Sequence, residues 1–344
     1  MTTRNSSFRI VFFCLALVFF LSGPAWGEPK YLWKMATLAP DSVGWARQIK
    51  KIVDPWMDEV TNHELATKVY WGGIMGDDED YVRKMHIGQL DGAGLSGQGV
   101  TLAVPEMAVL ELPFLFEGWN EVDYVKKNMR DSFDALALAR GYKIQSWIDQ
   151  DFDQLYSTRL PLSKPEHFAR SRFLTWYGPL EEEMLKALGA NPIPVNVPEA
   201  SASIRQGIVD SVLSPAIWMV GAQMYSVVRY VNPVRIRYSP ALILVTLEAW
   251  NKLPEIHRKN ILDTRYPVEQ RFCDEVRKDN QKCLDAMIAY GLKKVDMLPQ
   301  DLEEMKARTL PVWDAMAGTL YPAETLEELK THLKTCRAEK GNSP

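Results

Sequence analysis

Few residues of this chain have the types and spacing of a catalytic or metal site. The acidic run Asp77–Asp80 could suggest a metal site, but it follows Gly76 in the first turn of a predicted helix. Acidic side chains there stabilise the helix dipole and cap free backbone amides. The run Glu181–Glu183, which opens a helix after Pro179, has the same interpretation. We therefore predict no catalytic residue, no metal and no cofactor.

One stretch matches a nucleotide-binding fingerprint. Residues 92–97 have the sequence GAGLSG, which fits the pattern GxGxxG. In a dinucleotide-binding fold these glycines form the turn after a strand and open a helix. Here Leu90–Ser96 is itself predicted to be the strand, so we interpret the glycines as strand residues.

Aromatic residues are better candidates for a binding site. Loops at the carboxyl ends of parallel strands form the usual ligand crevice of α/β folds. Six aromatic residues lie at or near predicted strand ends or chain crossings: Trp147, Phe152, Trp176, Tyr177, Trp218 and Tyr238. We expect some of them to wall an apolar pocket and the others to belong to the core.

Residues 1–27 are predicted to be a signal peptide. Arg4 and Arg9 precede the apolar run Ile10–Leu21, and Ala25 and Gly27 supply the small residues of a cleavage site after Gly27. A helix that spans a bilayer needs about 20 apolar residues, so this run is too short. We therefore predict export to the periplasm.

The remaining chain is long enough for two domains of about 100–200 residues each. A net charge of −4 argues against a nucleic-acid partner. Cys273 and Cys283 lie on one predicted helix, about 15 Å apart, which is too far for a disulfide. Either one of them pairs with Cys336, or all three thiols are unpaired.

Strands and helices alternate along the chain, which predicts an α/β fold with mixed sheets flanked by helices. We place lobe I at residues 28–149 and 239–260, and lobe II at residues 150–238. A long helix over residues 255–290 would brace both lobes, and helices within residues 291–344 would pack on them. Two lobes joined by several crossings predict a hinge and a cleft.

Several motifs carry a family resemblance. Leu112–Phe116 has the sequence LPFLF, residues 186–192 have KALGANP, and residues 206–210 have QGIVD. Together with the loops Ala39–Ser42 and Gly73–Gly76, these resemble the substrate-binding proteins of TRAP (tripartite ATP-independent periplasmic) transporters, from about Tyr31 to Ile261. The resemblance implies a two-lobed periplasmic binding protein fold. It also implies a non-catalytic protein that closes on a solute and delivers it to membrane subunits driven by a sodium gradient.

The resemblance implies two arginines and an asparagine at the ligand site, and this chain has none of them. The position of the carboxylate-binding arginine is Leu174, that of the asparagine is Ser214, and that of a second arginine is Asp153. A dicarboxylate desolvated there would lack its counter-ions, at a cost of several kcal/mol per ion. Arg172 shares a strand face with Leu174 and offers a shifted anchor.

We therefore predict an apolar or weakly polar ligand, including lipid-like molecules, whose affinity comes from apolar burial at about 25 cal/mol per Å². The alternative is an organic acid held by Arg172, Arg205 or another shifted arginine. The resemblance adds Pro40, Asp41, Gly73, Ser96 and Gln98 to the predicted ligand-binding residues. It also points to a branch in which some members work beside a helical-repeat (TPR) partner. A sensor subunit without a transported solute is a further alternative.

Overall fold

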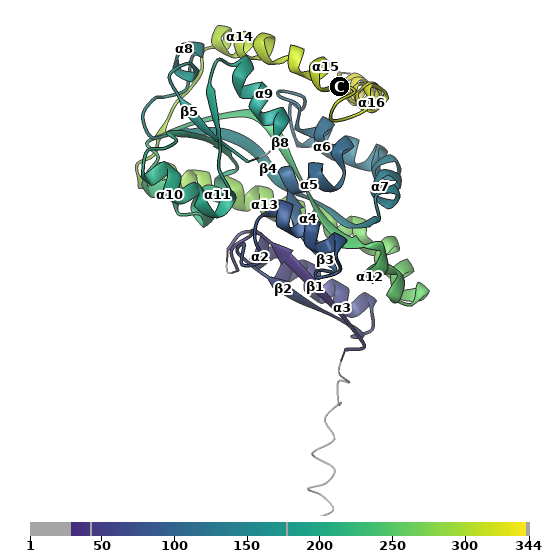
Figure 1. Cartoon of the computed structure of the whole chain (residues 1–344). Coiled ribbons are helices and arrows are strands. Elements are labelled where there is room, and N and C mark those ends of the chain that lie inside the picture. The colour runs from purple at the N-terminus through teal and green to yellow at the C-terminus, as the bar shows by residue number, and fades with distance from the viewer. Residues whose placement is uncertain (1–28, 42, 177, 342–344) are drawn as a thin grey trace, which may run out of the picture.

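The computed structural model describes residues 29–41, 43–176 and 178–341 (Figure 1). Its described strands form one continuous mixed sheet in the order β2-β1-β3-β8-β4-β7-β5-β6, with β9 paired to β8. The strands are β1 (Tyr31–Thr37), β2 (Leu65–Tyr70), β3 (Gly92–Ser96), β4 (Tyr142–Ser157), β5 (Arg172–Thr175), β6 (Asn191–Pro194), β7 (Ser211–Ser214), β8 (Tyr230–Thr246) and β9 (Lys293–Lys294). The predicted α/β class and two-lobed arrangement are confirmed, but the lobes share one sheet instead of having one each.

Two long antiparallel strands, β4 and β8, run through both lobes. The predicted lobe boundaries fall inside these strands. There the pairing register shifts between Asp149 and Asp151, opposite Pro240 and Ser239. Asp151 has a φ of 117°, which is strained for a residue other than glycine. The ladder is therefore irregular where the chain crosses from one lobe to the other.

The glycines of the GxGxxG stretch lie in β3, as predicted. β3 is paired with β1 on one side and β8 on the other. A Cβ atom on Gly92 would come within 2.3 Å of the Leu244 carbonyl oxygen. Close packing in the sheet therefore explains this glycine without a nucleotide.

Helices cover both faces of the sheet in lobe I. One face carries α4 (Asp78–His86), α5 (Gln98–Ala103), η2 (Pro105–Glu111), α6 (Trp119–Asn128) and α7 (Arg130–Ala139). The other carries α2 (Trp45–Gln48), the π-helical turn η1 (Ile49–Val53), α3 (Asp54–Val60) and α12 (Leu247–Lys252). The π turn comes directly before Pro55, whose ring cannot fit a regular α-helical turn.

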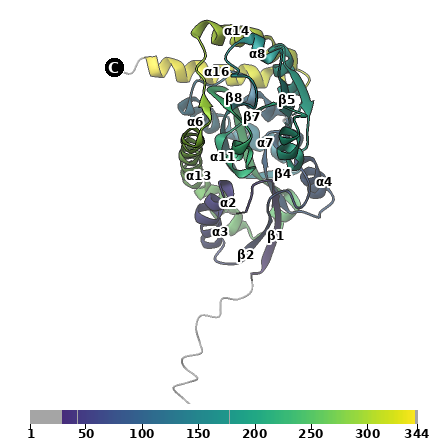
Figure 2. The same cartoon turned by 90° about the vertical axis from the view of Figure 1, so that its left-hand side faces the viewer.

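Lobe II has its own helices, and the C-terminal helices connect it to lobe I. Lobe II contains α8 (Pro165–Phe168), α9 (Pro179–Ala187), η3 (Val197–Glu199), α10 (Ala200–Arg205), α11 (Ala216–Gly221) and η4 (Met224–Ser226). The C-terminal helices are α14 (Pro299–Thr309), α15 (Pro311–Met316) and α16 (Ala323–Gly341). α14 packs on α8 and α9, whereas α16 packs on α6 and η2. They lie at the end of the molecule opposite α2 and α3 (Figure 2).

The predicted long helix is present as α13 (Glu255–Tyr290) and continues through Pro267. Phe272 and Val276, near its middle, are buried in the lobe I core, and Leu284 and Met287, near its C-terminal end, are buried in the lobe II core. The bracing role predicted for it is therefore confirmed.

The three described cysteines, Cys273, Cys283 and Cys336, are unpaired. The structure thus favours the second of the two thiol predictions. No helix within the described ranges is long and apolar enough to cross a membrane. The predicted signal peptide lies outside the described residues.

Candidate functional site

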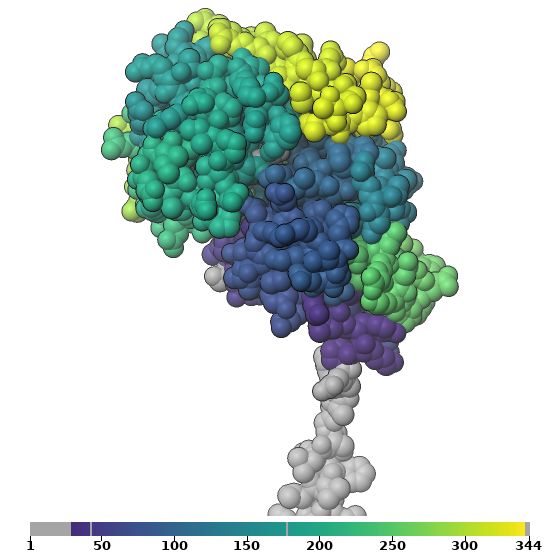
Figure 3. Space-filling view, viewed as in Figure 1, coloured from purple at the N-terminus to yellow at the C-terminus, as the bar shows by residue number. Residues whose placement is uncertain are grey.

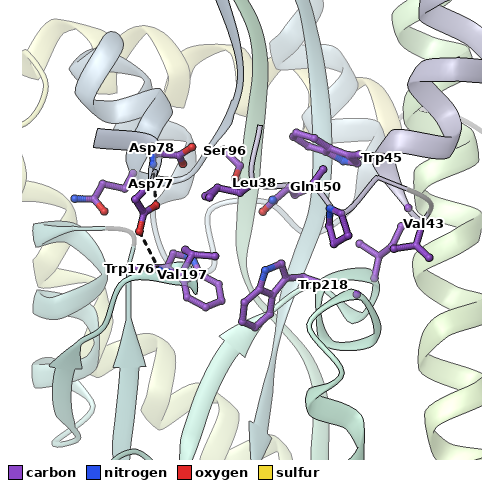
Figure 4. A pocket seen from close by; sticks show the side chains of 16 residues that line it. Leu38, Val43, Trp45, Asp77, Asp78, Ser96, Gln150, Trp176, Val197 and Trp218 are labelled. Carbon is purple, nitrogen blue, oxygen red and sulfur yellow. Dashed lines mark hydrogen bonds between the residues drawn. The ribbon is translucent and has the colours of Figure 1, made fainter. Parts of the chain in front are cut away.

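A pocket lies between the two lobes, which meet along the boundary visible in Figure 3. Its cavity volume is about 60 Å³. A small organic solute fits this space better than a lipid does. Figure 4 shows the lining residues, which are Leu38, Ala39, Pro40, Val43, Gly44, Trp45, Asp77, Asp78, Ser96, Gln98, Gln150, Trp176, Val197, Ile217, Trp218 and Gly221.

Direct contacts hold the lobes together around this pocket. The Asp77 carboxylate of lobe I accepts a hydrogen bond from the Val197 amide of lobe II at 3.0 Å. The Asn280 side chain on α13 donates to the Gln150 carbonyl at 2.9 Å and accepts from the Ile217 amide at 2.8 Å. α13 thereby joins the strand crossing in β4 to the wall formed by α11.

Five of the predicted ligand-binding residues lie together in the pocket lining: Pro40, Ser96, Gln98, Trp176 and Trp218. Asp41 and Gly73 lie outside it. The Asp41 carboxylate pairs with Lys50 at 2.5 Å, and Gly73 lies beside Leu38. Tyr177 lies outside the described residues.

The other five predicted residues are not part of the pocket. Trp147 packs against Phe133, with ring centroids 5.4 Å apart, while Phe152 packs against Tyr238 at 6.0 Å. Leu174 is buried in the lobe II core, the Ser214 hydroxyl donates to the Pro215 carbonyl, and the Tyr238 hydroxyl donates to Asp149. The prediction for these five is corrected because both faces of the central strands are covered. Strand position alone therefore does not bring a side chain to the cleft.

The prediction missed Trp45, Asp78, Gln150 and Ile217. Trp45 lies just after the Ala39–Ser42 loop, so its position close to Pro40 was the available signal. Its indole N–H donates to the Asp149 carbonyl at 3.0 Å, which fixes the ring. The Trp176 and Trp218 rings meet edge to face, with centroids 4.1 Å apart. Three tryptophans therefore wall the pocket.

No lysine, arginine or histidine occurs among the described residues that line the pocket. The guanidinium of Arg172, the proposed shifted anchor, pairs with Asp210, with Nε 3.3 Å from Oδ2. Arg205 donates to the Gln223 carbonyl at 2.7 Å and to the Ser226 hydroxyl at 3.2 Å. The side chains of both arginines therefore have partners in lobe II that lie outside the pocket lining.

The sequence matches the family described as bacterial extracellular solute-binding protein, family 7, over residues 35–319. The chain belongs to this family.

Comparisons with individual proteins agree with this assignment. The C4-dicarboxylate-binding periplasmic protein of Rhodobacter capsulatus is 24% identical over 326 residues, which cover 92% of this chain and 94% of that protein. The sugar-acid-binding protein of Advenella mimigardefordensis, solved with galactonate, has a TM-score of 0.83 at 17% identity, covering 90% of this chain and all of that one. A TRAP periplasmic solute-binding protein of Sulfurospirillum deleyianum with bound succinate has a TM-score of 0.79 at 19% identity. The match covers 88% of this chain and 99% of that one.

As a family 7 protein, the chain is an extracytoplasmic solute-binding protein of the TRAP type and not an enzyme. The predicted family and non-catalytic role are therefore confirmed. Cleavage after Gly27 stays a prediction.

Four titratable residues form a buried group where η2, β4, α9 and β8 meet. Arg237 on β8 donates to Asp153 on β4 through Nε at 2.8 Å and through an Nη atom at 2.5 Å. Glu111 and Glu181 each place an oxygen 3.6 Å from the same guanidinium. All four side chains are at most 1% exposed. One guanidinium group therefore contacts three carboxyl groups.

Glu181 does more than stabilise the start of α9, which was its predicted role. Its carboxylate accepts a hydrogen bond from the Trp176 amide at 3.0 Å and faces Arg237. The corrected interpretation is that Glu181 ties the pocket wall to the buried group. An acidic triplet at a helix start gave no sign of this, because the arginine partner lies far along the chain.

The pKa of Glu111 is raised from an ordinary value of 4.5 to about 8, mainly because the side chain is buried. Arg237 opposes this rise, and the neighbouring Asp153 and Glu181 contribute to it. Between these two values the folded protein holds a proton that the unfolded chain releases, so this group destabilises the fold progressively as pH rises from about 4.5 to 8. Glu111→Gln removes that ionisation. We expect the melting temperature of Glu111→Gln relative to the wild type to increase from pH 5 to pH 9, measured by calorimetry. A difference that is constant with pH would contradict the raised pKa.

Proposed function

We propose that the protein is the solute-binding subunit of a TRAP transporter for a small organic solute that is apolar or weakly polar and is not held through a carboxylate. The observation that carries the proposal is the pocket lining. Trp45, Trp176 and Trp218 form apolar walls, and the described lining residues include two aspartates and no cationic side chain. A carboxylate buried there would meet two acidic side chains and no counter-ion.

The solute would be enclosed by closure of the lobes and passed to the membrane subunits of the transporter. The irregular register of β4 and β8 and the interlobe bond from Asp77 to Val197 support a hinge at the strand crossing. The small space in the pocket argues against the lipid-like end of the predicted ligand range. A helical-repeat partner stays a prediction.

An organic acid is the second candidate, and the ligands of structural neighbours favour it. Galactonate and succinate occupy two of those proteins. In this chain Arg172 is bonded to Asp210, and the buried Arg237 already faces Asp153, Glu111 and Glu181. The charges in and around the pocket therefore favour the first candidate.

A ligand screen separates the two candidates. Native mass spectrometry of the purified protein should reveal a co-purifying small molecule that lacks a carboxyl group, and thermal-shift assays should identify stabilisers that are largely apolar and carry no carboxyl group. Trp218→Ala should weaken their binding by about 2 kcal/mol, or about thirtyfold, because the variant loses a buried indole.

Arg172→Ala is the matched control for this screen, because its side chain lies outside the pocket and should leave solute affinity unchanged. If succinate or galactonate alone raises the melting temperature, and Arg172→Ala abolishes that effect, the organic-acid candidate replaces the first.

A further inference from the structure

We propose that the solute carries an amino group, positively charged when bound, which sits between the Asp78 carboxylate and the tryptophan walls of the pocket. This inference rests on the proposed function, since it takes the interlobe pocket as the binding site, and it narrows the class of solute. It assigns Asp78 a role in binding the solute, whereas the sequence alone indicated only that Asp78 stabilises a helix.

Asp78 is a buried residue of the pocket lining, only 4% exposed, and burial and the neighbouring Asp77 raise the pKa of its carboxyl group well above the ordinary value. A cationic group bound beside it would favour the ionised form. Its Oδ1 atom has no hydrogen-bond partner among the described residues. In Figure 4, Asp78 and Asp77 lie on the lobe I side, while Trp176 and Trp218 lie on the opposite side of the pocket. A buried oxygen without a partner costs about 1–3 kcal/mol. This oxygen is covered in the structure, and a donor on the solute that reaches it as the pocket wall adjusts would recover that cost.

Capping of α4 does not account for Asp78. The capping box of α4 is formed by Asp77, whose side chain accepts from the backbone, and by Asp80, which bonds back to the Asp77 amide. The backbone amides of Gly99 and Ser96 interact with the Asp78 carboxyl. A Cβ atom on Gly99 would come within 2.7 Å of Asp78 Cγ, so a larger residue there would displace the carboxyl. The chain therefore makes room for this group in the pocket wall.

The surroundings of Asp78 select among hydrogen-bond donors. Asp77 adds a second acidic group, and the described lining supplies no cation. Indole faces attract cations through the ring quadrupole, more strongly when water is excluded. An ammonium group combines N–H donors for the Asp78 oxygen with a positive charge suited to the indoles of Trp45, Trp176 and Trp218. A hydroxyl group offers the hydrogen bond alone, and a carboxylate is repelled.

Matched series of small molecules test this inference. Ethylamine, butylamine and cyclohexylamine are compared by calorimetry with the alcohols and the carboxylates that have the same hydrocarbon groups. We expect at least one amine to bind at least tenfold more tightly than its alcohol. Asp78→Asn keeps the side-chain shape and one acceptor oxygen but removes the charge, so the preference for the amine should disappear in this variant.

Asp80→Asn is the matched control, because Asp80 lies in the same helical turn but outside the pocket lining. This variant should keep the amine preference. Circular dichroism checks that both variants fold. Equal affinity for amines and alcohols, no binding by any amine, or an unchanged preference in Asp78→Asn overturns the inference. Binding of alcohols as tightly as amines leaves the proposed function standing, whereas tightest binding of the carboxylates overturns both.

Discussion

Arg237→Met should lower the free energy of unfolding by about 3–5 kcal/mol, the range seen when one partner of a buried ion pair is removed. Arg237 is the cation shared by Asp153, Glu111 and Glu181, and all of these side chains are buried. Its loss leaves three carboxyl groups that must be desolvated without a counter-ion or bind protons. Urea unfolding followed by circular dichroism at pH 7 measures the change.

Two further variants test the electrostatic origin of this loss. Arg235→Met changes an exposed arginine on the same strand and should cost less than about 1 kcal/mol. The double variant Arg237→Met/Asp153→Leu removes a charge of each sign and should recover part of the lost stability. If the double variant is less stable than Arg237→Met alone, packing of the arginine stem is the main contribution and the charge argument fails.

Gly44→Ala should weaken solute binding by roughly tenfold to a hundredfold, because it should hinder closure of the cleft. Gly44 has φ 53° and ψ −121°, a conformation that residues with a side chain rarely adopt. A Cβ atom there would come 3.0 Å from the Ile217 side chain on the opposite lobe. The added methyl group therefore strains the loop and crowds the facing wall. Calorimetric titration with the solute that co-purifies with the wild type measures the effect.

Gly72→Ala is the matched control for this effect. Gly72 also has a positive φ, 67°, but a Cβ atom there would meet nothing within 4 Å. This variant carries the backbone strain without the contact across the cleft. Equal losses of affinity in Gly44→Ala and Gly72→Ala would show that local strain, and not closure against Ile217, is responsible.

The local elements of this fold were predictable because their signals are short-range. Asp77 before an acidic first turn predicts the start of α4, and the structure shows a capping box there. A long helix is predicted over 255–290, and α13 follows it through Pro267. Motifs such as LPFLF at 112–116 carried the family resemblance that the comparisons confirm.

The membership of the pocket was predictable only in part. Trp176 and Trp218 lie in the pocket lining, whereas Trp147 and Tyr238 do not, although all four were predicted at or near strand ends or chain crossings. The difference depends on whether helices cover the strand where each residue lies. α13 and the lobe I helices cover β4 and β8 on both faces, so these rings are buried in the core.

The sequence by itself determined the α/β class, the order of the elements and the family. The tertiary structure decided which charges meet. Asp153 and Arg237 are 84 residues apart in the chain but pair across the β4–β8 ladder, and Asp78 enters the pocket only because α4 packs on α5. Such contacts depend on strand register and helix packing, which form between distant segments and leave no local pattern in the sequence.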